Sequence, residues 1–136
     1  MSKNDKNVYR RIMRKLESGR PMVAYMAHPY SRNPGDNKTD ARMAMAELHH
    51  RFPYVAFINP LDNFRAIDGE EYEAILFLCK QIIYRCDLVI FAGDQSAISA
   101  SRGCAEEFAV ARYAHGIPCF HFEKNGLLYP MFDFQF

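Results

Sequence analysis

The sequence CDLVIF at residues 86–91 continues as AGDQSAISA at 92–100 and as SRGCAEE at 101–107. The first segment is an apolar run rich in β-branched and aromatic residues, which predicts a short buried strand. The second is rich in small and polar residues and predicts a loop. The third opens a helix that continues through Tyr113 and ends at Gly116, before Pro118. This arrangement leaves unpaired backbone N–H groups at the helix start, where an anion can bind.

Two adjacent glutamates of this helix have different expected surroundings. Glu106 lies four residues after Arg102, a spacing that predicts an ion pair on the solvent face. Glu107 shares its helix face with small or apolar residues, namely Gly103, Cys104, Val110 and Ala111. A carboxylate on such a face is either buried at a cost in free energy or directed into a cavity, the alternative being an ordinary surface glutamate. Glu107 is therefore the first candidate for a functional carboxylate.

Length and composition indicate one globular domain with a core: 136 residues, 49% hydrophobic and 24% charged. A formal net charge of +1 gives no reason to expect a nucleic-acid polymer or a membrane surface as a partner. No apolar run approaches the roughly 20 residues that span a bilayer, and the polar start is not typical of a secretory signal. The four cysteines lack metal-type spacing, so we expect reduced thiols, a cytoplasmic location, and neither metal nor cofactor.

Helices and strands alternate along the rest of the chain. Apolar residues at helical spacing predict helices over 5–18, 36–51 and 70–84, and apolar runs predict strands over 22–27, 54–58 and 117–122. Pro118 suggests the start of a strand or an edge position. The alternation predicts an α/β fold, a Rossmann-like or flavodoxin-like three-layer sandwich with a parallel sheet of about four to five strands. The expected domain spans residues 1–136, with a core over 21–122 and an aromatic tail over 123–136 that docks on its own core or on a second subunit.

Ligands of such sheets bind at the carboxyl ends of the strands, where the loops 28–36, 59–69 and 92–103 are expected to open. His28 is either a ligand or proton donor, or a structural histidine at a strand end. Tyr30 either stacks on a flat ligand or covers the rim of the core. Neither a Walker loop nor a GxGxxG fingerprint is present.

Taken together, these segments resemble the nucleoside 2-deoxyribosyltransferase superfamily, including its small phage and bacterial members. The matching pieces are YMAHPY at 25–30, CDLVI at 86–90, Ser101-x-Gly103-x-x-x-Glu107, and GIP at 116–118. They occur in the family's order and cover most of residues 22–122. Their order and spacing together are more specific than any one piece.

The resemblance implies cleavage or transfer at the N-glycosidic bond of a nucleoside or nucleoside 5′-monophosphate, and a homo-oligomer whose sites are completed by a neighbouring subunit. The glutamate at the Glu107 position attacks the anomeric carbon, and water or another base resolves the glycosyl-enzyme. Ser101 matches the branch that hydrolyses 5′-monophosphates, and beside Arg102 it suits a phosphate. The expected substrate-binding residues are His28, Pro29, Tyr30, Asp94, Ser99, Ser101, Arg102 and Gly103.

One position departs from the family pattern. Family enzymes generally carry a second acid eight residues before the Asp87 position, where it assists departure of the base; here that residue is Cys79. A thiol, with an ordinary pKa of about 8.5, is a poor substitute for a carboxylic acid. Either another group such as His28 or Asp94 takes over, or catalysis is slow, or the protein is a non-catalytic nucleotide-binding or sensing module. Asp87 itself is expected to be structural.

Overall fold

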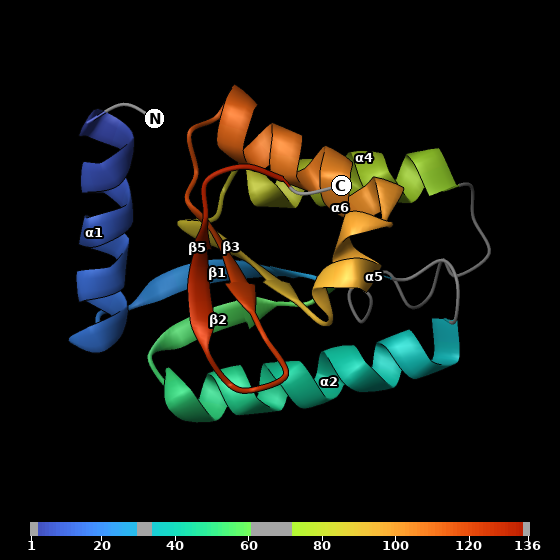
Figure 1. Cartoon of the computed structure of the whole chain (residues 1–136), viewed down its shortest axis with the longest axis horizontal. Coiled ribbons are helices and arrows are strands. Elements are labelled where there is room, and N and C mark those ends of the chain that lie inside the picture. The colour runs from blue at the N-terminus through green and yellow to red at the C-terminus, as the bar shows by residue number, and fades with distance from the viewer. Residues whose placement is uncertain (1–2, 30–33, 61–71, 135–136) are drawn as a thin grey trace.

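The computed structural model describes residues 3–29, 34–60 and 72–134 (Figure 1). Its elements are, in chain order, α1 (Lys3–Glu17), β1 (Met22–Ala27), α2 (Pro34–Arg51), β2 (Val55–Ile58), α4 (Tyr72–Ile83), β3 (Leu88–Ala92), α5 (Gln95–Ser99), α6 (Arg102–Phe108), the π-helix η2 (Ala109–Ala114), β4 (Cys119–Phe122) and β5 (Leu128–Met131). None of the helices within the described ranges combines the length and apolar character that crossing a membrane requires.

The strands form one five-stranded sheet in the order β2-β1-β3-β4-β5. The first four in this order are parallel to their neighbours, and β5 runs antiparallel to β4. The predicted α/β class is therefore confirmed; the predicted parallel sheet is right for β1 to β4, whereas β5 is antiparallel. Going from β1 to β2 and then to β3, the chain crosses from one side of β1 to the other. The carboxyl ends of β1 and β3 are thus the place where the strand order reverses, which is where open α/β sheets bind ligands.

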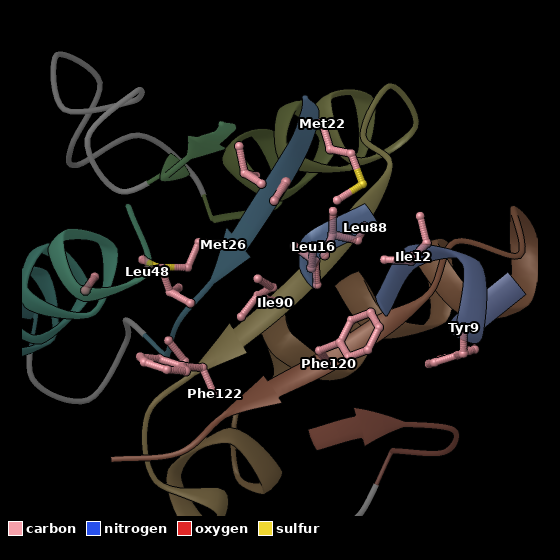
Figure 2. Packing of buried hydrophobic residues seen from close by; sticks show 14 residues of the cluster. Tyr9, Ile12, Leu16, Met22, Met26, Leu48, Leu88, Ile90, Phe120 and Phe122 are labelled. Atoms are coloured by element: carbon pink, nitrogen blue, oxygen red, sulfur yellow. The ribbon is translucent and has the colours of Figure 1, made fainter. Parts of the chain in front are cut away.

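Helices cover both faces of this sheet, with α2 along one face and α4 and α6 along the other (Figure 1). Side chains alternate along β1, so that Met22, Ala24 and Met26 face α1 and α2, whereas Tyr25 and Ala27 face α4 and α6. Figure 2 shows the first of these cores, in which residues of α1 and α2 pack against those of the strands. Burial of such side chains, at about 1.5–3 kcal/mol each, holds the helices on the sheet.

Three structural features differ from the sequence predictions. The segment 92–100, predicted as a loop, contains the short helix α5. Pro118 precedes β4, which is an internal strand, so the start of a strand is right and the edge position is wrong. The predicted tail 123–136 contains β5, which a local pattern did not indicate because Pro130 interrupts it. Proline is tolerated there because β5 is an edge strand.

The aromatic tail docks on the chain's own core. Phe132 lies against Tyr9, with ring centroids 4.7 Å apart, and Phe134 lies against Phe108 at 5.6 Å. Phe132 keeps 37% of its surface exposed, so docking leaves part of the tail uncovered. Phe136 lies outside the described residues.

Candidate active site

Glu107 is buried, with 7% of its surface exposed, on the inner side of α6. The helix begins at Ser101, whose hydroxyl oxygen accepts a hydrogen bond from the backbone N–H of Cys104 at 3.1 Å. This N-cap fixes where the helix starts, and hence which residues face the sheet. Cys104 and Phe108 face the sheet with Glu107. Of the alternatives predicted for Glu107, the structure therefore shows burial.

Tyr25 of β1 donates a hydrogen bond from its hydroxyl to Oε2 of Glu107. Burial raises the pKa of Glu107 to about 7, whereas the hydrogen bond from Tyr25 and the charge of Lys80 lower it. Burial also raises the pKa of Tyr25 well above its ordinary value, and the neighbouring Glu107 adds to that shift. Near neutral pH the carboxyl group is thus divided between its acid and carboxylate forms, while Tyr25 remains a donor.

Two cysteines complete the surroundings of Glu107. Cys79 of α4 interacts with both Tyr25 and Glu107, and burial, together with the charge of Glu107, raises its pKa to about 12. Cys104 is fully buried, and the same two causes raise its pKa above its ordinary value. Both thiols are therefore protonated at neutral pH, and neither is a thiolate nucleophile. Cys79 nevertheless lies close enough to interact with the carboxylate of Glu107.

Glu106, the preceding residue, is directed toward α4, where Lys80 lies. Its carboxylate lies 3.4 Å from Arg102 and 3.8 Å from Lys80. The predicted ion pair between Glu106 and Arg102 is confirmed. Arg102 also donates to Glu73 of α4 at 2.6 Å, and its side chain is 64% exposed. In this structure the guanidinium of Arg102 is thus engaged by two carboxylates, which a phosphate would have to displace or join.

A second set of predicted residues lies at the carboxyl ends of β1 and β3. His28 donates from Nδ1 to the carbonyl oxygen of Pro29 at 2.8 Å, and burial lowers the pKa of His28. A Cβ on Gly93 would lie 3.5 Å from Nε2 of His28, so the two loops are in close contact. Gly93 has a φ of +120°, a conformation that favours glycine. Asp94, the following residue, pairs with Lys124 at 3.4 Å.

Two more predicted residues lie in α5 and α6. Ser99 accepts a hydrogen bond from Gln95 at 2.9 Å within α5. Gly103 lies in the first turn of α6 and is half-buried. Tyr30 lies outside the described residues. A hollow of about 290 Å³ opens beside His28 and Gly93, between α2 and the end of β4, and Glu107 does not line it.

Sequence reasoning missed two residues of these sets. Tyr25 belongs to the YMAHPY motif but was not assigned a role, although strand alternation would have placed it on the face that α6 covers. His121 of β4 is buried and donates from Nε2 to the carbonyl oxygen of Gly93 at 2.8 Å, so it holds the turn after β3. No local pattern marks such a long-range contact.

Asp87 has the structural position expected of it. The backbone N–H of Val23 donates to Oδ2 of Asp87 at 2.8 Å, and the N–H of Asp87 donates to the carbonyl of Val23 at the same distance. These bonds join the start of β3 to β1. Among the residues that the structure describes, no three His, Cys, Asp or Glu side chains are grouped so that they could hold a metal ion.

The arrangement therefore holds a desolvated carboxylate in place, the kind of group that serves as a nucleophile once an electrophilic carbon reaches it, and Tyr25 is bonded to one of its oxygens. Comparison with protein-family models, with curated proteins and with solved structures gave no match to this chain.

Proposed function

We propose that this protein cleaves, or transfers at, the N-glycosidic bond of a nucleoside or nucleoside 5′-monophosphate, as a member of the nucleoside 2-deoxyribosyltransferase superfamily. The observation that carries the proposal is the buried Glu107, hydrogen-bonded by Tyr25 on a helix face of small and apolar residues. Burying a carboxylate costs free energy, and groups buried at such a cost cluster at functional sites.

In this proposal Tyr25 holds Oε2 of Glu107, and Oε1 attacks C1′ of the sugar. The Oε1–C1′ bond forms as the C1′–N bond breaks, and the electron pair of the broken bond leaves with the base. Water, or a second base, then attacks C1′, Glu107 leaves as a carboxylate, and the proton lost by the attacking group passes to the departed base. Two displacements at one carbon retain its configuration, as in retaining glycosidases.

We also propose that the sheet belongs to a Rossmann-like, flavodoxin-like three-layer sandwich. The strand order 2-1-3-4-5 supports this, since it is the order of flavodoxin-like sheets, although β5 is reversed here. The site for the sugar would then lie near the carboxyl ends of β1 and β3. The cap residue Ser101 would face its 5′ substituent, because a hydroxyl that accepts one hydrogen bond can still donate another.

We propose in addition that the protein assembles as a homodimer or larger oligomer through the region of β5 and the tail. Leu127, Tyr129 and Phe132 support this, since they are 51%, 42% and 37% exposed in the single chain. Light scattering at micromolar protein concentration should give at least twice the mass of one chain. A clean monomer would contradict this part of the proposal.

The experiment that tests the activity is incubation of the purified protein with a panel of nucleosides and 5′-monophosphates, with ribose and with 2′-deoxyribose. Chromatography then detects the free base. We expect release from at least one member of the panel by the wild type, and none above background by Glu107→Gln. Equal release by both proteins would show that Glu107 is not the nucleophile.

The second candidate function is nucleotide binding without catalysis. It is favoured by the high pKa values of Tyr25 and Cys79, since neither group readily gives up a proton to a leaving base. Calorimetry on the same panel separates the two candidates. Tight binding without release of base, altered only in affinity by Glu107→Gln, would favour the binding module.

A further inference from the structure

The groups around Glu107 determine which leaving groups it can displace. When a neutral base leaves a sugar, it carries away the electron pair of the C1′–N bond and needs a proton. In the described part of the chain, the groups in contact with or close to the Glu107 carboxylate are Tyr25, Cys79 and Cys104. All three are buried, and all hold their protons at neutral pH. A group whose pKa lies far above the working pH is an inefficient general acid.

Among the described residues, no cation is in contact with the Glu107 carboxylate. The hydrogen bond to Glu107 comes from the neutral hydroxyl of Tyr25. Lys80 acts on Glu107 only through space, and its ammonium group pairs with Glu106 at 3.8 Å. Arg102 of α6 pairs with Glu106 of the same helix and with Glu73 of α4. A buried carboxylate with these neighbours is stabilised by a positive charge that arrives with the ligand.

We propose that the preferred substrates of this site are N-glycosides whose base carries a fixed positive charge, such as N7-alkylated purine nucleotides or N-ribosylpyridinium nucleotides. The inference rests on the proposed function and names its substrate class. The cationic ring pairs with the carboxylate of Glu107 in the bound state. It also removes the need for a proton donor, because the base leaves as a neutral molecule.

The reaction balances without an acid. Oε1 of Glu107 bonds to C1′, the C1′–N bond breaks, and its electron pair cancels the positive charge of the ring. Water then adds to C1′, Glu107 leaves as a carboxylate, and one proton passes to the solvent. The products are the free sugar or sugar phosphate, the neutral base and a proton. Water is the only co-reactant.

The test compares 7-methylguanosine 5′-monophosphate with guanosine 5′-monophosphate, each as ribose and deoxyribose forms, after subtraction of spontaneous release. For the wild type we expect kcat/KM to favour the methylated nucleotide by at least about 10²-fold, the lower end of what a general acid contributes. Nicotinamide mononucleotide is a second cationic substrate of different shape. Wild-type kcat/KM values within tenfold of each other for the charged and neutral nucleotides would overturn the inference.

Cys79→Asp introduces an acid beside Tyr25 and Glu107, and Cys79→Asn is its control, with nearly the same shape but no acidic proton. We expect Cys79→Asp to reduce the preference for the charged nucleotide by at least about tenfold, and Cys79→Asn to retain it. The preference is a ratio of two kcat/KM values measured on one protein. A change in the reactivity of Glu107 affects both values and therefore cancels in the ratio. An unchanged preference in a folded Cys79→Asp protein would overturn the inference.

A measurement on the wild type alone covers the case in which the variants fail to fold. Across neutral nucleotides of one sugar, log kcat/KM should fall steeply as the N–H group of the released base becomes less acidic. A flat dependence would mean that the site supplies a proton, and would overturn the inference.

Glu107→Gln separates this inference from the proposed function. If Glu107→Gln no longer releases base from either substrate class while the wild type shows no preference, only the proposed substrate class is wrong. If it releases base as the wild type does, or if the wild type cleaves neither class, the proposed function fails and the inference fails with it.

Discussion

Tyr9 and Tyr25 are both buried, one on each face of the sheet, and their hydroxyl groups have different partners. Tyr9 of α1 donates to the backbone carbonyl of Met131 at 2.5 Å and accepts from the N–H of Cys119 at 3.1 Å. It therefore ties α1 to β4 and β5 through groups that do not titrate. Tyr25 instead donates to a carboxylate that titrates near neutral pH. Tyr9 thus provides hydrogen-bond partners for two buried backbone groups, whereas Tyr25 influences the charge of Glu107.

The surroundings of the two tyrosines extend this difference. The core on the α1–α2 face consists of apolar side chains around Tyr9 (Figure 2). On the α4–α6 face the core includes Tyr25, Cys79 and Cys104, and these enclose Glu107. A protein can bury apolar groups on both faces, so a carboxylate buried on one of them at a cost points to that face as the functional one.

The largest expected effect is the loss of turnover in Glu107→Gln. Glutamine keeps the shape and one hydrogen-bonding oxygen but removes the attacking charge, so turnover should fall by about 10³-fold or more while ligand affinity changes by about 1 kcal/mol or less. Glu106→Gln is the matched control, because it removes a neighbouring charge that pairs with Arg102 and Lys80 but leaves the Glu107 carboxylate in place, and its turnover should stay within about twofold of wild type. Steady-state kinetics and calorimetry on the three proteins check this. A comparable loss of turnover in both variants would remove the distinction between Glu106 and Glu107.

The next effect is the contribution of Glu107 to the dependence of stability on pH. Because the pKa of Glu107 is raised from 4.5 to about 7, the folded state binds its proton more tightly than the unfolded state does. The contribution is fully present below about 4.5 and is lost as pH rises through about 7, to a total of about 3 kcal/mol. Urea unfolding at pH 5 and pH 8 should show this loss in the wild type, and Glu107→Gln should lack it.

The same titration predicts that the free-enzyme kcat/KM rises with pH through about 7, because only the carboxylate attacks. At pH 8 Glu107→Gln should therefore be the more stable protein and the less active one. Identical pH dependence of stability in wild type and variant would mean that Glu107 is not desolvated as described.

Removing each tyrosine hydroxyl tests the comparison directly. Tyr25→Phe takes away the hydrogen bond that lowers the pKa of Glu107, and turnover at neutral pH should fall by about 10- to 10²-fold. Tyr9→Phe should leave turnover unchanged but reduce the free energy of unfolding by about 1–3 kcal/mol, since a buried N–H and carbonyl lose their partner. Kinetics and urea unfolding of both variants measure the two effects. A loss of turnover in Tyr9→Phe as large as in Tyr25→Phe would end the contrast between the faces.

The smallest expected effect concerns the 5′ substituent of the ligand. Ser101 at the start of α6, with Ser99 nearby in sequence, should make a 5′-monophosphate bind more tightly than the matching nucleoside by at least about 1 kcal/mol. Calorimetry with both ligands measures the difference, and Ser101→Ala should reduce it. Equal affinities for both ligands would place the 5′ end of the ligand away from the helix start.

Local sequence patterns predicted α1, α2, α4 and α6, four of the five strands in the described part of the chain, and the different surroundings of Glu106 and Glu107. These features depend on periodicity, which the chain carries in neighbouring residues. The patterns did not predict α5, whose residues are small and polar, or β5, which Pro130 interrupts. They also could not pair Tyr25 with Glu107, because the two lie 82 residues apart and meet only when α6 packs on β1.

The central claim is that Glu107 forms a covalent bond to the sugar, and mass spectrometry tests it most directly. The protein is mixed with a substrate whose second step is slowed, such as a nucleotide with fluorine at C2′, and its intact mass is measured before peptide mapping. The account predicts a mass increase of one glycosyl group, mapped to Glu107, present in Glu106→Gln and absent in Glu107→Gln. Release of base with no adduct on Glu107, and full turnover in Glu107→Gln, would contradict it.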